Sequence, residues 1–313
     1  MEHGYQAMVI HAFGEPGVLK PVTLSRPKPG EHELLIKVLS TAINPIDVKT
    51  RAGIGFAAEQ NKHHLPMSLG YDLFGEVVAC GEAVKTLKKG DKVMGMVGFA
   101  TQPGTYAQYC LARENELIKV DAVNEDAVLS GLCLAGLTAF QALSALACPK
   151  SQPIYINGAN GTVGSLAAQI AARMGYQVVA ISRSELPKSV ASCAQQMSYD
   201  QFVAEQRKGY LLDVVGLEVG KRCLQGLSAH SRVVTIPTLS QNEIIAAANE
   251  QGVTACGVLV VKNNAQLKRI YQWYRQGHLE LAHCTMPLSA AGMAHQRLEQ
   301  NSSKEKVILL PWT

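Results

Sequence analysis

The most informative pattern of apolar and polar positions in the chain lies between residues 153 and 184. An apolar run over 153–156 predicts a short buried strand, and glycines follow at 158, 161 and 164. Apolar residues then recur at helical spacing until Gly175, where the helix is predicted to end: Val163, Leu166, Ile170 and Met174. A second apolar run over 177–181 ends in polar residues. The pattern therefore predicts strand, glycine turn, helix and strand.

This order is typical of the first half of a nucleotide-binding α/β domain. Without side chains at the glycines, a pyrophosphate can approach the backbone N–H groups, and the helix can pack close to the strand. The helix N-terminus also offers free N–H groups and a positive dipole end. An ordinary tight turn is the alternative interpretation. The candidate dinucleotide residues are Gly158, Asn160, Gly161, Thr162, Val163 and Gly164.

The residues after the second strand bear on the choice of cofactor. An NAD site usually has an acidic residue there, which binds the ribose 2′-hydroxyl. This chain has Ser182, Arg183 and Ser184 instead, with Lys188 shortly after. A cation and hydroxyls suit a 2′-phosphate, so the sequence predicts NADPH. Two alternatives remain: the cations are simply solvated, or Glu185 reaches the ribose and favours NADH.

The two parts of the chain differ in periodicity. Short apolar runs separated by Gly and Pro turns predict a β-barrel-like first part, with strands at 6–10, 33–40, 70–79, 90–95 and 104–111. From residue 124, two helices are predicted within 125–148, with a break around 134–138. Further predicted strands are 211–216, 232–237, 254–261 and 306–310, with helices at 264–277 and 290–298.

Composition restricts the possible classes of protein. The 313 residues are 47% hydrophobic and 17% charged, with a net charge of +4 that is not concentrated in a basic run. Nucleic acid is therefore not expected as a partner. The sequence predicts no apolar run long enough to span a membrane and no signal peptide in the opening Met1-Glu2-His3-Gly4. Eight cysteines, none in a C-x-x-C pair, predict reduced thiols in a cytoplasmic protein and no structural zinc lobe.

Motifs spread along the chain resemble one family, the medium-chain dehydrogenase/reductases, and most closely their zinc-independent quinone oxidoreductase branch. They are Asn44-Pro45-x-Asp47-x-Lys49, Gly70-Tyr71-Asp72 with Gly75, Gly90-Asp91-Lys92-Val93, Gly104-x-Tyr106-Ala107, Leu137-Thr138-Ala139, the glycine turn and Asp213-Val214-Val215-Gly216. The resemblance implies a GroES-like domain over 1–122, completed by 280–313, and a Rossmann domain over 123–279. It also implies an active-site cleft where the domains meet, and dimers or tetramers joined through the edge strand 254–261.

The resemblance also indicates that no metal is used. Zinc-dependent relatives have a ligating cysteine where this chain has Asn44, and a histidine where it has Tyr71. Neither Asn nor Tyr is a usual zinc ligand. The adjacent His63 and His64 are expected to point apart in a loop.

The expected reaction is hydride transfer to a quinone or an α,β-unsaturated carbonyl. The oxygen that gains charge needs a hydrogen-bond donor and then a proton. The resemblance places Asn44, Lys49 and Tyr71 at the cleft as possible donors, with Asp47 orienting Lys49 or the loop. The alternatives are structural: Asn44 as a turn former, Asp47 as a helix cap, Lys49 as a solvated charge and Tyr71 as a core residue.

Further cofactor contacts are implied by the resemblance alone. Thr138 corresponds to a residue near the nicotinamide or a phosphate, and Tyr199 to a tyrosine near the adenosine phosphate, although a core role is an alternative for Tyr199. Backbone groups of two segments would hold the carboxamide, one with Thr235, Ile236 and Pro237 and one with Val258 and Leu259.

Three functions follow from these observations. The first is an NADPH-dependent, zinc-independent reductase of small quinones or activated alkenes. The second is a 2-enoyl-thioester reductase, which would need an acyl groove and a basic entrance that the sequence does not show clearly. The third is an NADPH-binding structural or regulatory protein without turnover.

Overall fold

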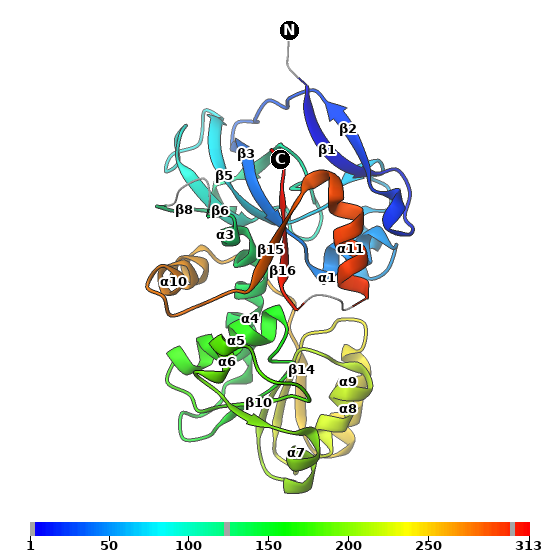
Figure 1. Cartoon of the computed structure of the whole chain (residues 1–313), viewed down its shortest axis with the longest axis vertical. Helices are drawn as coiled ribbons and strands as arrows, with labels where there is room; N and C mark the ends of the chain where they lie inside the picture. The colour runs from blue at the N-terminus through cyan, green and yellow to red at the C-terminus, as the bar shows by residue number, and fades with distance from the viewer. Residues whose placement is uncertain (1–3, 122–125, 301–303) are drawn as a thin grey trace. The chain divides into compact units, whose positions relative to one another are not determined.

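The computed structural model describes residues 4–121, 126–300 and 304–313 (Figure 1). The chain divides into two compact units. The first comprises Met1–Leu134, Val261–Tyr271 and Ala282–Thr313, and the second comprises Ala135–Val260 and Gln272–Leu281. The predicted domain boundary between residues 122 and 123 lies outside the described residues.

The second unit is built on a parallel six-stranded sheet in the order β11-β10-β9-β12-β13-β14. The strands are β9 (Ile154–Asn157), β10 (Val178–Ile181), β11 (Gln195–Met197), β12 (Tyr210–Asp213), β13 (Arg232–Thr235) and β14 (Thr254–Gly257). The strand order reverses between β9 and β12. In such sheets, ligands bind beyond the carboxyl ends of the strands at this reversal point.

Helices cover both faces of this sheet. Figure 1 shows α5 and α6 on one side of it and α8 and α9 on the other. The helices of this unit include α4 (Cys133–Leu146), whose first two residues belong to the first unit, and α5 (Thr162–Arg173), α6 (Lys188–Ala191), α7 (Tyr199–Glu205), α8 (Leu217–Leu224) and α9 (Gln241–Glu250). The helix α5 is buried over 164–171, whereas Val163 in its first turn is partly exposed. The predicted stop at Gly175 agrees with that residue's φ of +84°.

The first unit contains two sheets. A three-stranded sheet has the order β2-β1-β4, and a seven-stranded sheet has the order β15-β16-β3-β5-β6-β8, with β7 also paired to β3. All of these pairs are antiparallel except β15 with β16. The strands are β1 (Tyr5–Ile10), β2 (Lys20–Leu24), β3 (Glu33–Ala42), β4 (Met67–Ser68), β5 (Asp72–Cys80), β6 (Lys92–Met96), β7 (Tyr109–Arg113), β8 (Leu117–Lys119), β15 (His283–Pro287) and β16 (Lys306–Leu310).

Short helices flank these sheets. They are α1 (Pro45–Arg51), α2 (Phe56–Asn61), α3 (Val128–Gly131) and α11 (Ala291–Glu299), while α10 (Asn264–Arg275) contributes residues to both units. The 3₁₀ turns are η1 (Pro16–Val18), η2 (Glu114–Glu116) and η3 (Leu288–Ala290). The last strand matters for the site, because β16 pairs with the end of β3 and brings the tail beside the segment that enters α1.

Three expectations from the sequence need correction. The break between the two predicted helices lies at Leu132, earlier in the chain than the predicted 134–138, and the turn that contains His63 and His64 follows α2. The predicted strand at 104–111 is β7, at Tyr109–Arg113. The run Val128–Leu146 is apolar and long enough to cross a membrane, contrary to the expectation from the sequence, although 83% of an 18-residue window within it is buried, as in the core of a folded domain.

Candidate functional site

The glycine turn after β9 has the geometry that a pyrophosphate requires. Gly158 has a φ of +87°, and a Cβ at Gly164 would lie 2.2 Å from the Gly158 carbonyl oxygen. Larger side chains would therefore separate α5 from the strand. No side chain caps the N-terminus of α5 at Gly161, so its first N–H groups remain available for a ligand. The predicted turn residues fit a dinucleotide.

Asn160 links this turn to the loop that follows β10. Its Nδ2 donates hydrogen bonds of 3.0 Å to Ser182 Oγ and 2.7 Å to Ser184 Oγ. Its Oδ1 is buried and has no partner among the described residues. A free acceptor in this position is suited to a hydroxyl donor on a ligand.

A hollow opens beyond the ends of β10 and β11. Its lining includes two guanidinium groups from different elements, and its members are Ser182, Arg183, Gln196, Ser198, Tyr199, Asp200, Gln201 and Arg222. The exposed Lys188 is not part of this lining, and neither is Glu185. Sequence reasoning missed Arg222 and Asp200, because no local pattern relates α8 to the end of β10.

The hydroxyl of Tyr199 is directed into the protein. It donates a hydrogen bond of 2.7 Å to Asn157 Oδ1, and burial raises its pKa. Asn157 in turn donates to Asp213 at 2.8 Å, and the hydroxyl of Thr235 donates to the same carboxylate at 2.9 Å. Tyr199 thus joins α7 to β9, and Thr235 joins β13 to β12.

The remaining predicted cofactor residues of the second unit differ in exposure. Thr138 is buried in α4. Ile236, Pro237 and Val258 are partly exposed, and Leu259 is exposed. Their proposed contacts with the nicotinamide end of the cofactor stay predictions.

In the first unit, Asn44 is held from three directions. Its backbone N–H donates to Asp47 Oδ2 at 2.8 Å, which satisfies a group at the start of α1. Its side-chain Nδ2 donates to Asp72 Oδ2 at 2.8 Å, and its Oδ1 accepts from Lys306 Nζ at 2.5 Å. Asn44 is 1% exposed. Its amide is therefore already committed to internal partners.

The cluster around Asn44 contains two buried carboxyl groups and one buried ammonium group. Lys306 Nζ lies 3.6 Å from Asp72 Oδ2, and the other oxygen of Asp72 accepts from Leu134 N–H at 2.7 Å. Burial raises the pKa of Asp72 and lowers that of Lys306. Burial raises the pKa of Asp47 to about 7, and its Oδ1 has no partner among the described residues. Lys306 was absent from the predicted site residues.

The other two predicted catalytic residues, Tyr71 and Lys49, differ in burial and in hydrogen bonding. Tyr71 is fully buried and donates a hydrogen bond of 3.2 Å to the carbonyl oxygen of Ala100, and burial raises its pKa well above its usual range. Lys49 on α1 is only partly buried, and its ammonium has no ion pair or hydrogen bond within the described part of the chain. Burial lowers its pKa. Among the four predicted catalytic residues, Lys49 is the one whose polar group makes no hydrogen bond or ion pair with the described residues.

No metal centre is evident in the described ranges. No group of three or more His, Cys, Asp or Glu side chains there could hold a metal ion. His63 and His64 are both exposed, and His64 Nδ1 lies 3.5 Å from Asn61 Oδ1.

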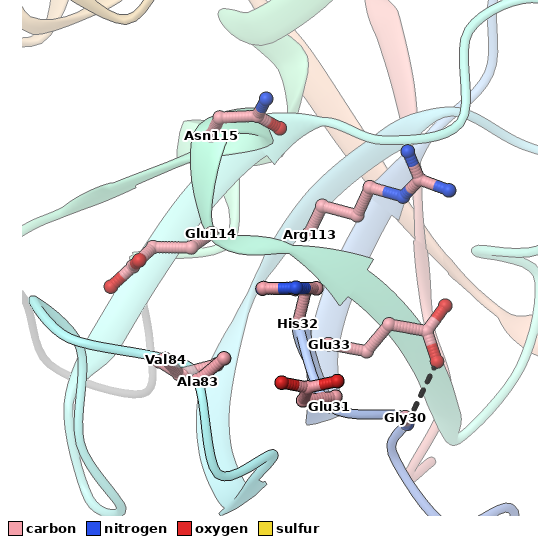
Figure 2. Close-up of a pocket in the computed structure, with 9 residues that line it drawn as sticks. All are labelled: Gly30, Glu31, His32, Glu33, Ala83, Val84, Arg113, Glu114 and Asn115. Carbon is pink, nitrogen blue, oxygen red and sulfur yellow. Dashed lines mark hydrogen bonds between the residues drawn. The ribbon is translucent and has the colours of Figure 1, made fainter.

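Figure 2 shows a separate hollow in the first unit. It is lined by Gly30, Glu31, His32, Glu33, Ala83, Val84, Arg113, Glu114 and Asn115. Two of its carboxylates serve the surrounding backbone: Glu33 accepts from Gly30 N–H at 2.9 Å, and Glu114 accepts from Leu87 N–H at 3.1 Å. None of the predicted site residues lines it.

Comparisons with known proteins agree with this architecture. The family model described as the alcohol dehydrogenase GroES-like domain matches residues 30–122, and the one described as zinc-binding dehydrogenase matches residues 194–309. A solved quinone oxidoreductase from Coxiella burnetii is 31% identical, with 98% of this chain and 99% of that one covered and a TM-score of 0.91. A solved Escherichia coli quinone oxidoreductase, in complex with NADPH, is 21% identical over 98% of this chain and all of that one, with a TM-score of 0.82, which indicates a shared fold.

Among curated proteins, the quinone oxidoreductase of Lama guanicoe is 31% identical over 219 residues. The match covers 69% of this chain and 63% of that protein, so the chain spans less than two thirds of this relative's length.

Proposed function

Because the chain belongs to the medium-chain dehydrogenase/reductase family, in its quinone oxidoreductase branch, we propose that it is an NADPH-dependent, zinc-independent reductase of quinones or α,β-unsaturated carbonyls. The observation that carries the proposal is the glycine turn from Gly158 to Gly164, followed by a hollow that contains guanidinium groups. NADPH would supply the hydride when bound, and the protein would supply position, polarity and a proton.

The choice of NADPH rests on charge. Arg183 follows β10, where a site for NAD usually has an acidic side chain, and it lines the hollow with Ser182. A guanidinium can form two parallel hydrogen bonds with a phosphate, whereas it has no comparable partner in a ribose hydroxyl. The exposed Glu185 offers its backbone oxygen to Asn160 at 3.4 Å and does not line this hollow. The arrangement favours the phosphorylated cofactor.

The proposed substrate class follows from the donors that are available. A quinone or enone spreads the added charge onto an oxygen, which one cationic hydrogen-bond donor can stabilise. Lys49 has such a group, and its lowered pKa makes it a better proton donor at neutral pH than an ordinary lysine. We assign to Lys49 the binding of that oxygen and the delivery of its proton. Asp47 stabilises the start of α1 through Asn44 and so positions the helix that carries Lys49.

Zinc independence is supported by the donors around Asn44. The positions that would supply a thiolate and an imidazole hold an amide and a phenol, both hydrogen-bonded internally. In addition, the Lys306 ammonium contacts Asn44 directly, and a fixed positive charge there opposes the binding of a divalent cation.

The test is a titration followed by turnover. Purified protein would be titrated with NADPH and with NADH by fluorescence. A benzoquinone, a phenanthrenequinone, a 2-alkenal and a crotonyl thioester would then be added while the absorbance of the reduced nicotinamide is followed. We expect preferential binding of NADPH and its oxidation with a quinone or the alkenal. Faster turnover of the thioester would instead favour an enoyl-thioester reductase, and tight binding without any turnover would favour a non-catalytic role.

A further inference from the structure

One of the two arginines that line the hollow beyond β10 lies on α8, outside the strand–turn–helix–strand segment that predicted the cofactor site. Arg222 lies in the last turn of α8, which follows β12, whereas Arg183 follows β10. Both side chains line the same hollow, and Tyr199 lines it too. Two guanidinium groups in one exposed hollow suit a ligand with two negative charges, such as a phosphate monoester.

Arg222 is held within the hollow by the protein itself. Its guanidinium forms an ion pair with Asp200 of α7 and lies 5.7 Å from the centre of the Tyr199 ring. The side chain of Asp200 is 88% exposed and that of Arg222 is 47% exposed. An ion pair this accessible to solvent is weak, so another anion can replace the carboxylate at little cost. Both Arg183 and Arg222 also lower the pKa of Tyr199, although burial raises it overall.

We propose that Arg222 is a specificity-determining residue of the cofactor site, whose guanidinium exchanges from Asp200 to the 2′-phosphate of NADPH. This inference rests on the proposed function, because it assumes that a dinucleotide occupies the glycine turn. Asp200 keeps Arg222 in the hollow before the cofactor binds. Its negative charge also opposes the 2′-phosphate, so Asp200 limits the preference for NADPH over NADH.

The neighbouring lysine provides a matched control. Lys221 also lies on α8 and carries the same charge, but it pairs with Glu218 at 3.2 Å and with Glu243 at 3.0 Å. It does not line the hollow. A change at Lys221 alters the net charge of α8 as much as a change at Arg222, without removing a group from the hollow.

The experiment compares Arg222→Met, Arg222→Lys, Asp200→Asn and Lys221→Met with the unmodified chain. Binding is measured by fluorescence for NADPH and NADH, and by calorimetry for adenosine 2′,5′-bisphosphate and adenosine 5′-monophosphate. We expect Arg222→Met to weaken binding of NADPH and of the bisphosphate about tenfold, which is typical for the loss of one charge-assisted hydrogen bond. NADH and the monophosphate should bind as before.

The other variants define the mechanism. We expect Arg222→Lys to retain part of the preference, because a lysine keeps the charge but not the paired geometry. Asp200→Asn should tighten NADPH binding about two- to fivefold, and this gain should shrink at high salt. Lys221→Met should change the NADPH to NADH ratio less than twofold.

The result separates this inference from the proposed function. If the unmodified protein prefers NADPH and Arg222→Met leaves that preference intact, Arg222 is an ordinary surface cation and the inference is wrong. The inference is also wrong if Arg222→Met weakens the binding of NADPH and NADH to the same extent. It is likewise wrong if Lys221→Met changes the NADPH to NADH ratio as much as Arg222→Met does. If the unmodified protein binds neither nucleotide, the proposed cofactor and this inference are both rejected.

Discussion

Asn157 donates a hydrogen bond of 2.8 Å to Asp213, and the two residues are paired in register at the carboxyl ends of β9 and β12. This is the point where the strand order of the parallel sheet reverses. Asp213 also accepts the backbone N–H groups of Val215 at 3.1 Å and Gly216 at 3.0 Å. These hydrogen bonds therefore connect Asn157, the residue before the glycine turn, with the start of the β12–α8 connection.

The hydroxyl of Tyr199 donates to Asn157 of this pair. A substitution can distinguish a structural role of Tyr199 from contact with the cofactor phosphate. We expect Tyr199→Phe to lower the free energy of unfolding by about 1–2 kcal/mol, because Asn157 Oδ1 loses a buried donor. Urea unfolding measures this, and an NADPH titration of the same variant measures cofactor binding. A phosphate-contacting role predicts the reverse, with several-fold weaker NADPH binding at unchanged stability.

The close approach at the glycine turn predicts a steric effect on binding. A Cβ at Gly164 would lie 2.2 Å from the carbonyl oxygen of Gly158, so Gly164→Ala must push α5 away from the turn. We expect NADPH and NADH to bind at least about tenfold more weakly, to similar extents, in fluorescence titrations. Gly104→Ala is the control, since nothing lies within 4 Å of its added Cβ. Unchanged affinity for Gly164→Ala would mean that the turn does not hold the pyrophosphate.

Lys49 is expected to affect turnover rather than cofactor binding. Lys49→Met should lower kcat with a quinone by about 10²-fold or more, the usual contribution of a positioned proton donor, while the affinity for NADPH stays the same. Burial lowers the pKa of Lys49 below its ordinary value of 10.5. Activity should therefore decline as pH rises, with the midpoint of the decline below pH 10.5. In Lys49→Arg, this alkaline limb should move to higher pH. An unaltered pH profile in Lys49→Arg would exclude Lys49 as the proton donor.

Lys306 should be far more important for stability than an exposed lysine. Lys306→Met leaves the buried carboxyl of Asp72 without its ammonium partner, and we expect the free energy of unfolding to fall by about 3–5 kcal/mol. The double variant Lys306→Met/Asp72→Asn should recover part of this, because one carboxylate is removed with the cation. Equal unfolding free energies for the single and double variants, measured in urea, would contradict the coupling of Lys306 to Asp72.

Asp47 makes stability depend on pH. Its folded pKa of about 7 lies above its ordinary value of 3.8, so the folded state binds its proton more tightly than the unfolded state does. The resulting stabilisation is fully present below pH 3.8 and is lost as pH rises to about 7. Over this pH range, the unfolding free energy should change by up to about 4 kcal/mol. We expect Asp47→Asn to remove most of this pH dependence in unfolding curves recorded from about pH 4 to pH 8. The same slope in both proteins would assign the titration to another group.

The sequence by itself determined the features that repeat over short distances. The alternation of apolar runs with glycines located β9, α5 and β10 within one or two residues, and the final strand lies at Lys306–Leu310 as predicted. These elements depend on side-chain periodicity and on backbone conformations that only glycine adopts easily, so neighbouring residues are sufficient to specify them. Family motifs then identified the fold that these elements form.

Only the tertiary structure decided which side chains meet and which are free. Asn44 lies 28 residues from Asp72 and 262 residues from Lys306, and the pairing of β16 with β3 brings the three together. This contact buries the Asn44 amide, which the motif indicated as a possible substrate donor, whereas Lys49 makes no ion pair or hydrogen bond with the described residues. The packing of α8 likewise places Arg222 in the hollow beyond β10. Such contacts depend on strand pairing and helix packing across distant segments, which local periodicity does not encode.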